Sequence, residues 1–372
     1  MVFSRLTIYY LTGTLGQGVL WLPMDGEPVL MLRKGVERAR LEAGLVPHPF
    51  KSYGQIPEIC AEAGSPLSKT VGTETSGLTW QLGNLLTAKM PDATFVPADH
   101  AIALAKAMKS EWELRIMRLS GQRHHETLHT IIPQRIRPGM TERELSHIAW
   151  EVFFEAGHQG NMRMQAHGEE CFLGHVAAGD SGNYPSIFNG PLGLRGEHPA
   201  SPYMGYAGKV WQEGEPLGMD IGFVLDGYHT DKTQTYWAGP ASTIPDEVRR
   251  AQDFCMDMQN WVAANARPGT TPEELYLYCA GEAEKRGFAE GFMGLGENKV
   301  PFIGHGIGLT IDEWPPLAKK FTQPLQAGMV IAVEPKQGIP GVGMVGVENT
   351  FEITEDGARC LTGDDYDIVC VE

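Results

Sequence analysis

The chain has 372 residues, of which 42% are hydrophobic and 20% are charged, and its formal net charge is −16. This composition is typical of a globular protein and the length favours two domains, while the negative charge argues against nucleic acid as a partner. No stretch approaches the roughly 20 apolar residues that a membrane-spanning helix needs, and the first residues lack the regions of a signal peptide. The six cysteines form no CxxC pair, so we expect reduced thiols in a cytoplasmic protein.

The N-terminal part of the chain alternates between predicted strands and helices. Residues 18–22 and 28–32 are predicted strands, because these apolar runs flank an Asp-Gly turn that favours a hairpin. Residues 80–89 have the pattern of a helix. This alternation favours a small α/β domain.

A domain boundary is predicted at the end of a helix that includes residues 101–108. We therefore expect an N-terminal domain of residues 1–108 and a C-terminal domain of residues 109–372.

Charge is distributed unevenly along the chain. Residues 1–110 carry 10 Lys and Arg and 9 Asp and Glu, whereas the remainder carries 20 Lys and Arg and 37 Asp and Glu. Some carboxylates of the second part are expected to surround cations, and the alternative is a solvated acidic surface.

The second part contains an internal repeat. The sequence RPGMT at residues 137–141 recurs as RPGTT at residues 267–271. Each copy has a glutamate three residues after its last threonine, which predicts a helix that begins with a capping box. A glycine closes each predicted helix, at Gly157 and at Gly287. The match favours a duplicated domain with a site between similar halves, and the alternative is two similar helix starts by chance.

Residues 217–237 predict a hairpin, because an Asp-Gly turn separates two apolar runs. In this register Gly222 lies opposite Asp231 and is expected to leave that face open. Asp220 shares the face with Asp231, since side chains alternate along a strand. Two ionised carboxylates this close require either a proton or a cation, and the alternative is an exposed pair.

His305 lies in the sequence GHGIG, whose glycines let backbone and ligands approach closely. A lone histidine is more often a structural residue that makes hydrogen bonds. The run lacks the full dinucleotide-binding pattern, so we exclude that interpretation.

Glu334 follows the four apolar residues 330–333, and an acidic side chain in such a place needs a partner. A hairpin centred near Gly341 would place Glu334 opposite Glu348, which gives a second pair of carboxylates. The alternative is a salt bridge to a basic residue. The nearest one, Lys336, is expected to point to the opposite side or into the turn.

Together these segments resemble metallopeptidase family M24, the creatinase, prolidase and aminopeptidase P group with the pita-bread fold. The resemblance rests on MDIGFVLDGYHTDKTQT with Asp220 and Asp231, GHGIGL with His305, VIAVEPK with Glu334 and VGVENTF with Glu348. It extends to the N-terminal domain through IYYLTG and AMKSEWEL. It implies an α+β fold with a C-terminal pita-bread domain and a smaller α/β creatinase-type domain, which is shorter here than the family norm.

The resemblance also implies a site for two divalent metal ions, with Asp231 and Glu348 as bridging ligands. Asp220 would complete the ligands of one ion, and His305 and Glu334 those of the other. One histidine among four carboxylates suits Mn, Fe, Co or Zn. A hydroxide that bridges the ions would attack the substrate, and Glu334 would be the catalytic residue that handles its proton. A small peptide substrate and a homodimer are further implications.

The sequence departs from the family pattern in several places. Asp312 stands where Xaa-Pro peptidases usually carry a histidine, and we predict a catalytic role for it over the alternative of a turn cap. The stretch before the first Asp ligand lacks a second histidine, and Gly346 replaces a usual arginine. Because these positions bind and protonate a peptidyl-proline substrate, the departures concern substrate specificity.

A loop of residues 186–203, rich in Gly and Pro, looks longer than in typical members. We predict that it lines the pocket, with His198 as a catalytic acid or base. Asn189 and Tyr203 are predicted to bind substrate. The alternative is a surface loop with an incidental histidine.

The leading hypothesis is a dinuclear-metal-dependent hydrolase, an exopeptidase similar to Xaa-Pro peptidases. The alternative is a non-peptide metal-dependent lyase or hydrolase on the same scaffold, with Asp312 as the base. A metal-free creatinase-like amidinohydrolase is a third hypothesis, which the complete ligand set disfavours. A fourth is a binding protein that has lost catalysis.

Overall fold

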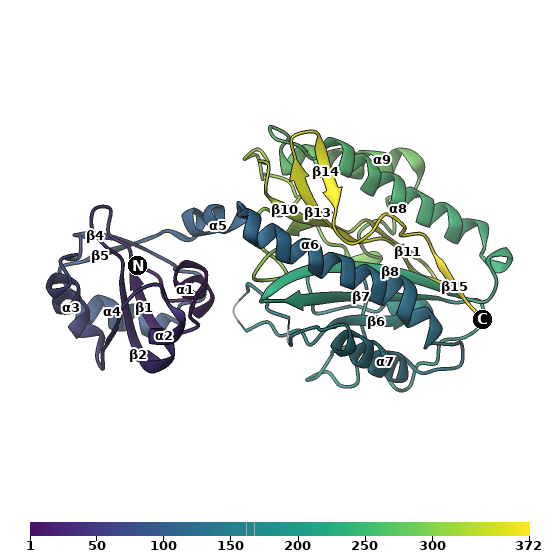
Figure 1. Ribbon diagram of the computed structural model, residues 1–372. Coiled ribbons are helices and arrows are strands. Elements are labelled where there is room, and N and C mark those ends of the chain that lie inside the picture. The colour runs from purple at the N-terminus through teal and green to yellow at the C-terminus, as the bar shows by residue number, and fades with distance from the viewer. Residues whose placement is uncertain (161, 167) are drawn as a thin grey trace. The chain divides into compact units, whose positions relative to one another are not determined.

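A computed structural model describes residues 1–160, 162–166 and 168–372 of the chain. The protein divides into two compact units (Figure 1). The first comprises Met1–Lys106 and Ala166–Gly168, and the second comprises Ala107–Gln165 and Glu169–Glu372. The boundary expected from the sequence falls two residues later, after Met108.

The first unit is a small α/β domain with a three-stranded sheet of order β1-β2-β3 and a two-stranded sheet of β4 and β5. Its strands are β1 (Gln17–Trp21), β2 (Val29–Lys34), β3 (Pro47–Pro49), β4 (Thr70–Thr73) and β5 (Thr94–Pro97). Its helices are α1 (Arg5–Thr12), α2 (Val36–Glu42), α3 (Ile56–Glu62), α4 (Trp80–Lys89) and α5 (Asp99–Ala107), the last of which ends at the boundary. The predicted hairpin and the predicted helix at residues 80–89 are confirmed, and their apolar side chains fill the core.

The second unit contains two four-stranded sheets, of order β15-β8-β7-β6 and β14-β13-β10-β9, and the small sheet β11-β12. Its strands are β6 (Gly174–Ala178), β7 (Pro216–Leu225), β8 (Tyr228–Ala238), β9 (Gly304–Gly306), β10 (Val330–Val333), β11 (Lys336–Ile339), β12 (Gly343–Gly346), β13 (Asn349–Thr354), β14 (Gly357–Cys360) and β15 (Val369–Val371). Its α-helices are α6 (Glu111–His125), α7 (Glu142–Glu155), α8 (Asp246–Asn265) and α9 (Pro272–Arg286). Within the described part of the chain, no helix is both long enough and apolar enough to cross a bilayer.

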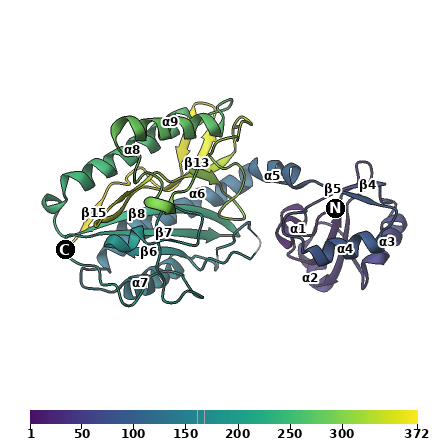
Figure 2. The same cartoon turned by 180° about the vertical axis from the view of Figure 1, so that it is seen from behind.

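Each of the two larger sheets has its own hydrophobic core. Phe153 of α7 packs with Phe223 of β7 in one core, and Leu275 of α9 packs with Ile331 of β10 in the other. Both views of the second unit show α7 on one side of the strands and α8 with α9 on the other (Figures 1 and 2). The strands between these helices carry the acidic residues predicted from the sequence.

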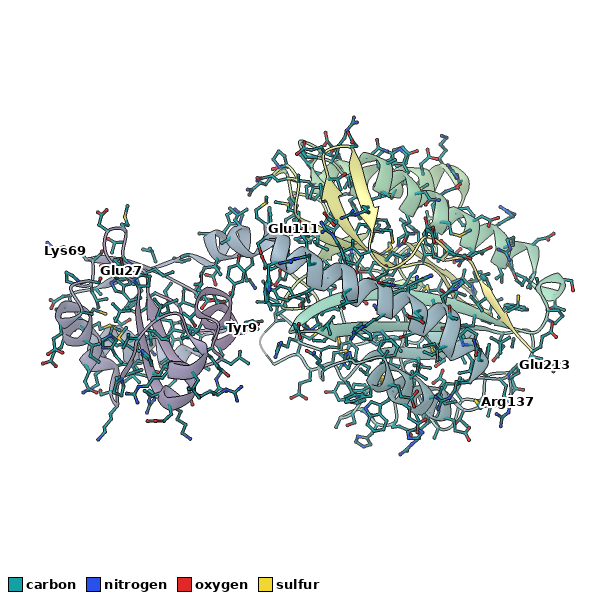
Figure 3. All side chains as sticks on the ribbon, in the orientation of Figure 1. Tyr9, Glu27, Lys69, Glu111, Arg137 and Glu213 are labelled. Atoms are coloured by element: carbon teal, nitrogen blue, oxygen red, sulfur yellow. The ribbon has the colours of Figure 1, made fainter. Side chains whose placement is uncertain are left out.

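The repeat begins α7 and α9 in the same way. Thr141 and Thr271 each form the predicted capping box with the glutamate three residues later. Gly157 and Gly287 follow the two helices with φ of 94° and 81°, a backbone conformation that favours glycine. The start of the first copy, Arg137, lies in the loop before α7 (Figure 3). Each copy therefore begins an outer helix of one of the two cores.

Both hairpins predicted in the second unit have the predicted register. Gly222 lies opposite Asp231 in the hairpin of β7 and β8. The hairpin of β11 and β12 is centred on Gly341. An antiparallel bridge between Thr233 and Glu348 joins β8 to the segment between β12 and β13, and so brings the acidic residues of both hairpins together.

Candidate metal centre

The first pair of carboxylates comes from the hairpin of β7 and β8. Asp220 and Asp231 share one face of the hairpin, as predicted, and little of either side chain is exposed. The backbone N–H and carbonyl of Asp231 both bond to the hydroxyl of Thr350, at 2.8 and 2.9 Å. Gly222 lines the same cavity as both carboxylates. A Cβ there would lie 1.9 Å from Met162 Cε, so the glycine also makes room for that side chain.

The second pair of carboxylates meets His305 of β9. Glu334 directly follows β10, and its Oε1 lies 3.7 Å from His305 Nε2. Glu348 directly precedes β13, and its Oε1 lies 3.9 Å from the same nitrogen. His305 Nδ1 lies 3.1 Å from the carbonyl oxygen of Gly306, which favours a proton on Nδ1 and leaves Nε2 as a ligand atom.

The residues of this cluster fit a divalent metal ion. Asp231, His305 and Glu348 each offer one ligand atom, and these atoms lie within 4.8 Å of one another. Two ligand atoms at about 2.1 Å from one ion lie at most about 4.2 Å apart, so small side-chain rotations bring the three around an ion. Glu334, whose Oε1 lies 3.7 Å from His305 Nε2, is a candidate for a fourth ligand. One imidazole with several carboxylates suits Mn, Fe, Co or Zn.

Burial of several carboxylates together changes their pKa values. Burial and the charge of Asp220 raise the pKa of Asp231 to about 7. Burial and the charge of Asp231 raise the pKa of Glu348 well above its ordinary value. Burial is the largest influence on Asp220 and raises its pKa, but the Lys336 ammonium, His175 and hydrogen bonds with Glu348 and Thr233 together outweigh it and leave that pKa below its ordinary value. A bound dication compensates such repulsion, so the cluster favours a cation.

Lys336 lies inside the cluster, and the prediction that it points away is wrong. Its Nζ lies 2.7 Å from Glu348 Oε2, 3.1 Å from Glu334 Oε2 and 3.3 Å from Asp220 Oδ2. The reason is strand alternation, because residues two apart share a face of an extended chain. Glu334 therefore forms the salt bridge to a basic residue that was the alternative in the sequence analysis. This salt bridge lies beside the group that fits a metal.

A cavity of about 380 Å³ opens onto the cluster, a volume typical of sites for small molecules. Asp220, Asp231, His305, Glu334 and Glu348 all line it. Its wall also includes the aromatic residues Phe188, Phe302, Trp314 and Phe321. The predicted ligands therefore lie at a surface that a small substrate can reach.

Asp312 and Asn189 line this same cavity. Asp312 Oδ1 accepts a hydrogen bond of 2.7 Å from the backbone N–H of Gln165, so its carboxyl is held in place. Burial raises the pKa of Asp312. A carboxyl that takes up a proton more readily than usual is suited to acid or base catalysis.

The other two residues predicted in the 186–203 loop do not reach the cavity. Among the described residues that line it, neither His198 nor Tyr203 is present. His198 is exposed in a tight turn, where its Nδ1 accepts a hydrogen bond from the Ala200 N–H. The Tyr203 hydroxyl donates to Glu170 at 3.2 Å. The loop turns back on itself at His198, where the Ser201 N–H donates a hydrogen bond to the His198 carbonyl.

His175 lines the cavity, and sequence reasoning missed it. It lies on β6 directly opposite Asp220 of β7, and its ring packs 4.9 Å from that of Phe188. Burial lowers the pKa of His175, which favours a neutral imidazole. No local pattern marks this residue, because it meets Asp220 only through the pairing of strands that a long loop separates.

Two sheets that place an imidazole and carboxylates at a cavity define a metal-binding hydrolase with the pita-bread fold. Comparison with known families agrees with this class. Residues 115–355 match metallopeptidase family M24, and residues 1–105 match the creatinase/prolidase N-terminal domain. The chain therefore belongs to metallopeptidase family M24 and is a hydrolase of that family, as its resemblance predicts.

Relatives and solved structures match almost the whole chain. An Xaa-Pro dipeptidase from Pyrococcus furiosus is 25% identical over 97% of this chain and 92% of its own length. The structure of a prolidase from Pyrococcus furiosus aligns with a TM-score of 0.77 and 24% identity, covering 98% of this chain and 96% of that one. An Xaa-Pro dipeptidase structure from Bacillus anthracis aligns with a TM-score of 0.80 and 22% identity, covering 100% and 94%. These similarities confirm the fold predicted from the sequence.

Proposed function

We propose that the protein is a metal-dependent exopeptidase that cleaves short peptides with proline beside the scissile bond. The observation that carries the proposal is the group of Asp231, His305 and Glu348 at a cavity of about 380 Å³. A cavity of this size accommodates a small peptide, and its aromatic wall suits an apolar ring. The relatives named Xaa-Pro dipeptidase support this class of substrate.

Asp231, His305 and Glu348 would hold a divalent ion, which would supply the chemistry of activating a water and polarising a substrate carbonyl. The side chains around it hold the substrate and move protons. To Glu334, which lies beside His305, we assign the role of accepting a proton from the attacking water. Asp312 has a raised pKa at the same cavity and donates a proton to the leaving nitrogen.

The expectation of two ions bridged by a hydroxide remains a prediction. Asp220 is the carboxylate available to a second ion. It also lies 3.3 Å from the ammonium of Lys336, which competes for the same oxygen. The number of ions therefore depends on whether Lys336 stays in the cluster.

A non-peptide metal-dependent lyase or hydrolase is the second candidate. The observation that favours it is Asp312, which lines the cavity where the resemblance leads one to expect a histidine. A carboxylate base beside a metal-bound substrate is suited to proton abstraction from carbon. In this second function Asp312 acts as a base and accepts a proton from carbon. In the peptidase it acts as an acid and donates a proton to the leaving nitrogen.

The test is a panel of Xaa-Pro dipeptides with matched Xaa-Ala dipeptides, assayed on metal-stripped protein reloaded with Mn, Co, Zn or Fe. We expect cleavage of the Xaa-Pro peptides that requires metal and is abolished in His305→Ala. Asp312→Asn should retain its metal but lose turnover about 100-fold or more, the usual contribution of a general acid. If the metal-loaded protein cleaves no peptide, the exopeptidase proposal fails, and an unbiased substrate screen then tests the lyase.

A further inference from the structure

The two glutamates of the cluster each divide their oxygens between two positions. Oε1 of Glu334 and Oε1 of Glu348 face His305 Nε2, at 3.7 and 3.9 Å. Oε2 of both residues faces Lys336 Nζ, at 3.1 and 2.7 Å. The carboxylates thus bridge two places for positive charge, and an ammonium holds one of them.

The Lys336 side chain is packed inside the hairpin and is not a surface side chain that lies over the cluster. Its side chain is 1% exposed. It lies opposite Gly346, where a Cβ would be 2.7 Å from the Lys336 Cα and 2.5 Å from the Pro335 carbonyl oxygen. With φ of 139° at Gly346, the backbone also disfavours any side chain there. The hairpin therefore holds the lysine stem against a strand position that only glycine fits.

The residues of the cluster also divide between a place for a metal ion beside His305 and the place that the Lys336 ammonium holds. The group that fits a metal consists of Asp231, His305 and Glu348 and includes neither Asp220 nor Glu334. Glu334 nevertheless has its Oε1 3.7 Å from His305 Nε2. Asp220 instead lies 3.3 Å from the Lys336 ammonium. The carboxylate that a second ion would need is thus already occupied by a fixed cation.

Charge balance points in the same direction. Asp220, Asp231, Glu334 and Glu348 together carry four negative charges when ionised. One dication with Lys336 balances three of these charges, so the ammonium supplies positive charge that a second ion would otherwise have to supply.

We propose that Lys336 takes the place of one of the two metal ions, so that the protein binds a single divalent ion at His305, Asp231, Glu334 and Glu348. The inference rests on the proposed metal-dependent function, since it concerns how many ions that function uses. The ammonium acts as a permanent positive charge that keeps Asp220 and the two glutamates in position.

The experiment measures metal content and not activity. Metal-stripped wild-type protein is saturated with Mn²⁺, and the bound metal is determined by plasma mass spectrometry and by calorimetric titration. We expect about one Mn²⁺ per chain, with the electron paramagnetic resonance spectrum of an isolated ion. Asp220→Asn should keep about one ion, because Asp220 pairs with Lys336, whereas His305→Ala should lose most of the binding.

Lys336→Ala is the decisive variant, with Lys336→Arg as its matched control. The alanine variant should bind about two Mn²⁺ per chain and give the spectrum of an exchange-coupled pair, while the arginine variant should bind about one. An alanine variant that stays at one ion would overturn the proposed role of the lysine. If that variant does not fold, the wild-type stoichiometry and spectrum still decide the question.

Wild-type protein with two coupled ions would overturn the inference and leave the proposed metal-dependent function intact. Wild-type protein that binds no Mn²⁺, Co²⁺, Zn²⁺ or Fe²⁺ would instead overturn the proposed function itself. The two failures therefore give different metal counts.

Discussion

His229 connects β8 to the loop that follows His305. Its Nδ1 lies 3.0 Å from the Gly308 carbonyl oxygen, and its Nε2 accepts a hydrogen bond of 3.0 Å from the Arg163 N–H. A proton on Nδ1 and none on Nε2 satisfies both contacts, so the folded protein requires a neutral ring. This imidazole fixes the segment between the proposed metal ligand His305 and Asp312.

The free energy of unfolding is expected to fall as the pH is lowered, in part because of His229. Burial lowers the pKa of His229 to about 4, whereas a histidine of the unfolded chain has a pKa of about 6.5. Between these values the unfolded chain binds a proton that the folded chain does not, so stability is lost as pH falls below about 6.5 and the loss levels off below about 4. At pH 5 the loss amounts to about 2 kcal/mol.

Urea unfolding at pH 7.5 and pH 5.0, on wild type and on His229→Gln, measures this contribution. Other buried histidines act in both proteins and cancel in the difference. Glutamine retains one donor and one acceptor but does not titrate. The variant should lose about 2 kcal/mol less than wild type between the two pH values, and equal losses would show that His229 does not have the lowered pKa.

At the scale of elements, α6 and the loop after β9 are joined by a buried ion pair. Lys109, which directly precedes the N-cap of α6, lies 3.1 Å from Glu313, and both side chains are almost completely buried. The other oxygen of Glu313 accepts hydrogen bonds from the N–H groups of Leu309 and Thr310. These contacts position the loop that carries Asp312. Glu111, the first residue of α6, is labelled in Figure 3.

The two repeated capping boxes should contribute equally to stability. In both α7 and α9 the threonine hydroxyl accepts a hydrogen bond of 3.2 Å from the N–H of the glutamate that bonds back to it. Thr141→Ala and Thr271→Ala should each lower the free energy of unfolding by about 1 kcal/mol, because each leaves one N-terminal N–H, that of the glutamate, without its side-chain acceptor. Urea unfolding of both variants measures this.

Thr141→Ser and Thr271→Ser are the matched controls, since serine keeps the hydroxyl and should recover most of the loss. A cost confined to one helix would indicate that the two copies have different structural roles. In that case the shared sequence would reflect local capping and not a duplicated half of the domain.

At the scale of the whole molecule, local sequence rules were sufficient to predict those parts of the fold and site whose geometry is set by neighbouring residues. Strand alternation and Asp-Gly turn chemistry placed Asp220 and Asp231 on one face, and a hairpin centred on Gly341 placed Glu334 opposite Glu348. The resemblance to a known family added the overall fold. These parts of the prediction depend on residues close together in the sequence.

Features that depend on distant contacts could not be predicted in the same way. His175 reaches Asp220 through the pairing of β6 with β7, and nothing in its own segment signals this. The position of His198 depends on how a long loop turns. Lys336 is different, because the alternation rule that was applied to Asp220 would also have placed it beside Glu334.

The central claim is that Asp231, His305 and Glu348 hold a divalent ion at the cavity. Anomalous X-ray diffraction from crystals of the Mn-loaded protein tests it most directly. We expect a strong anomalous peak in contact with His305 Nε2 and with carboxylate oxygens of Asp231 and Glu348. A peak elsewhere, or none at these residues in protein saturated with Mn²⁺, would contradict it.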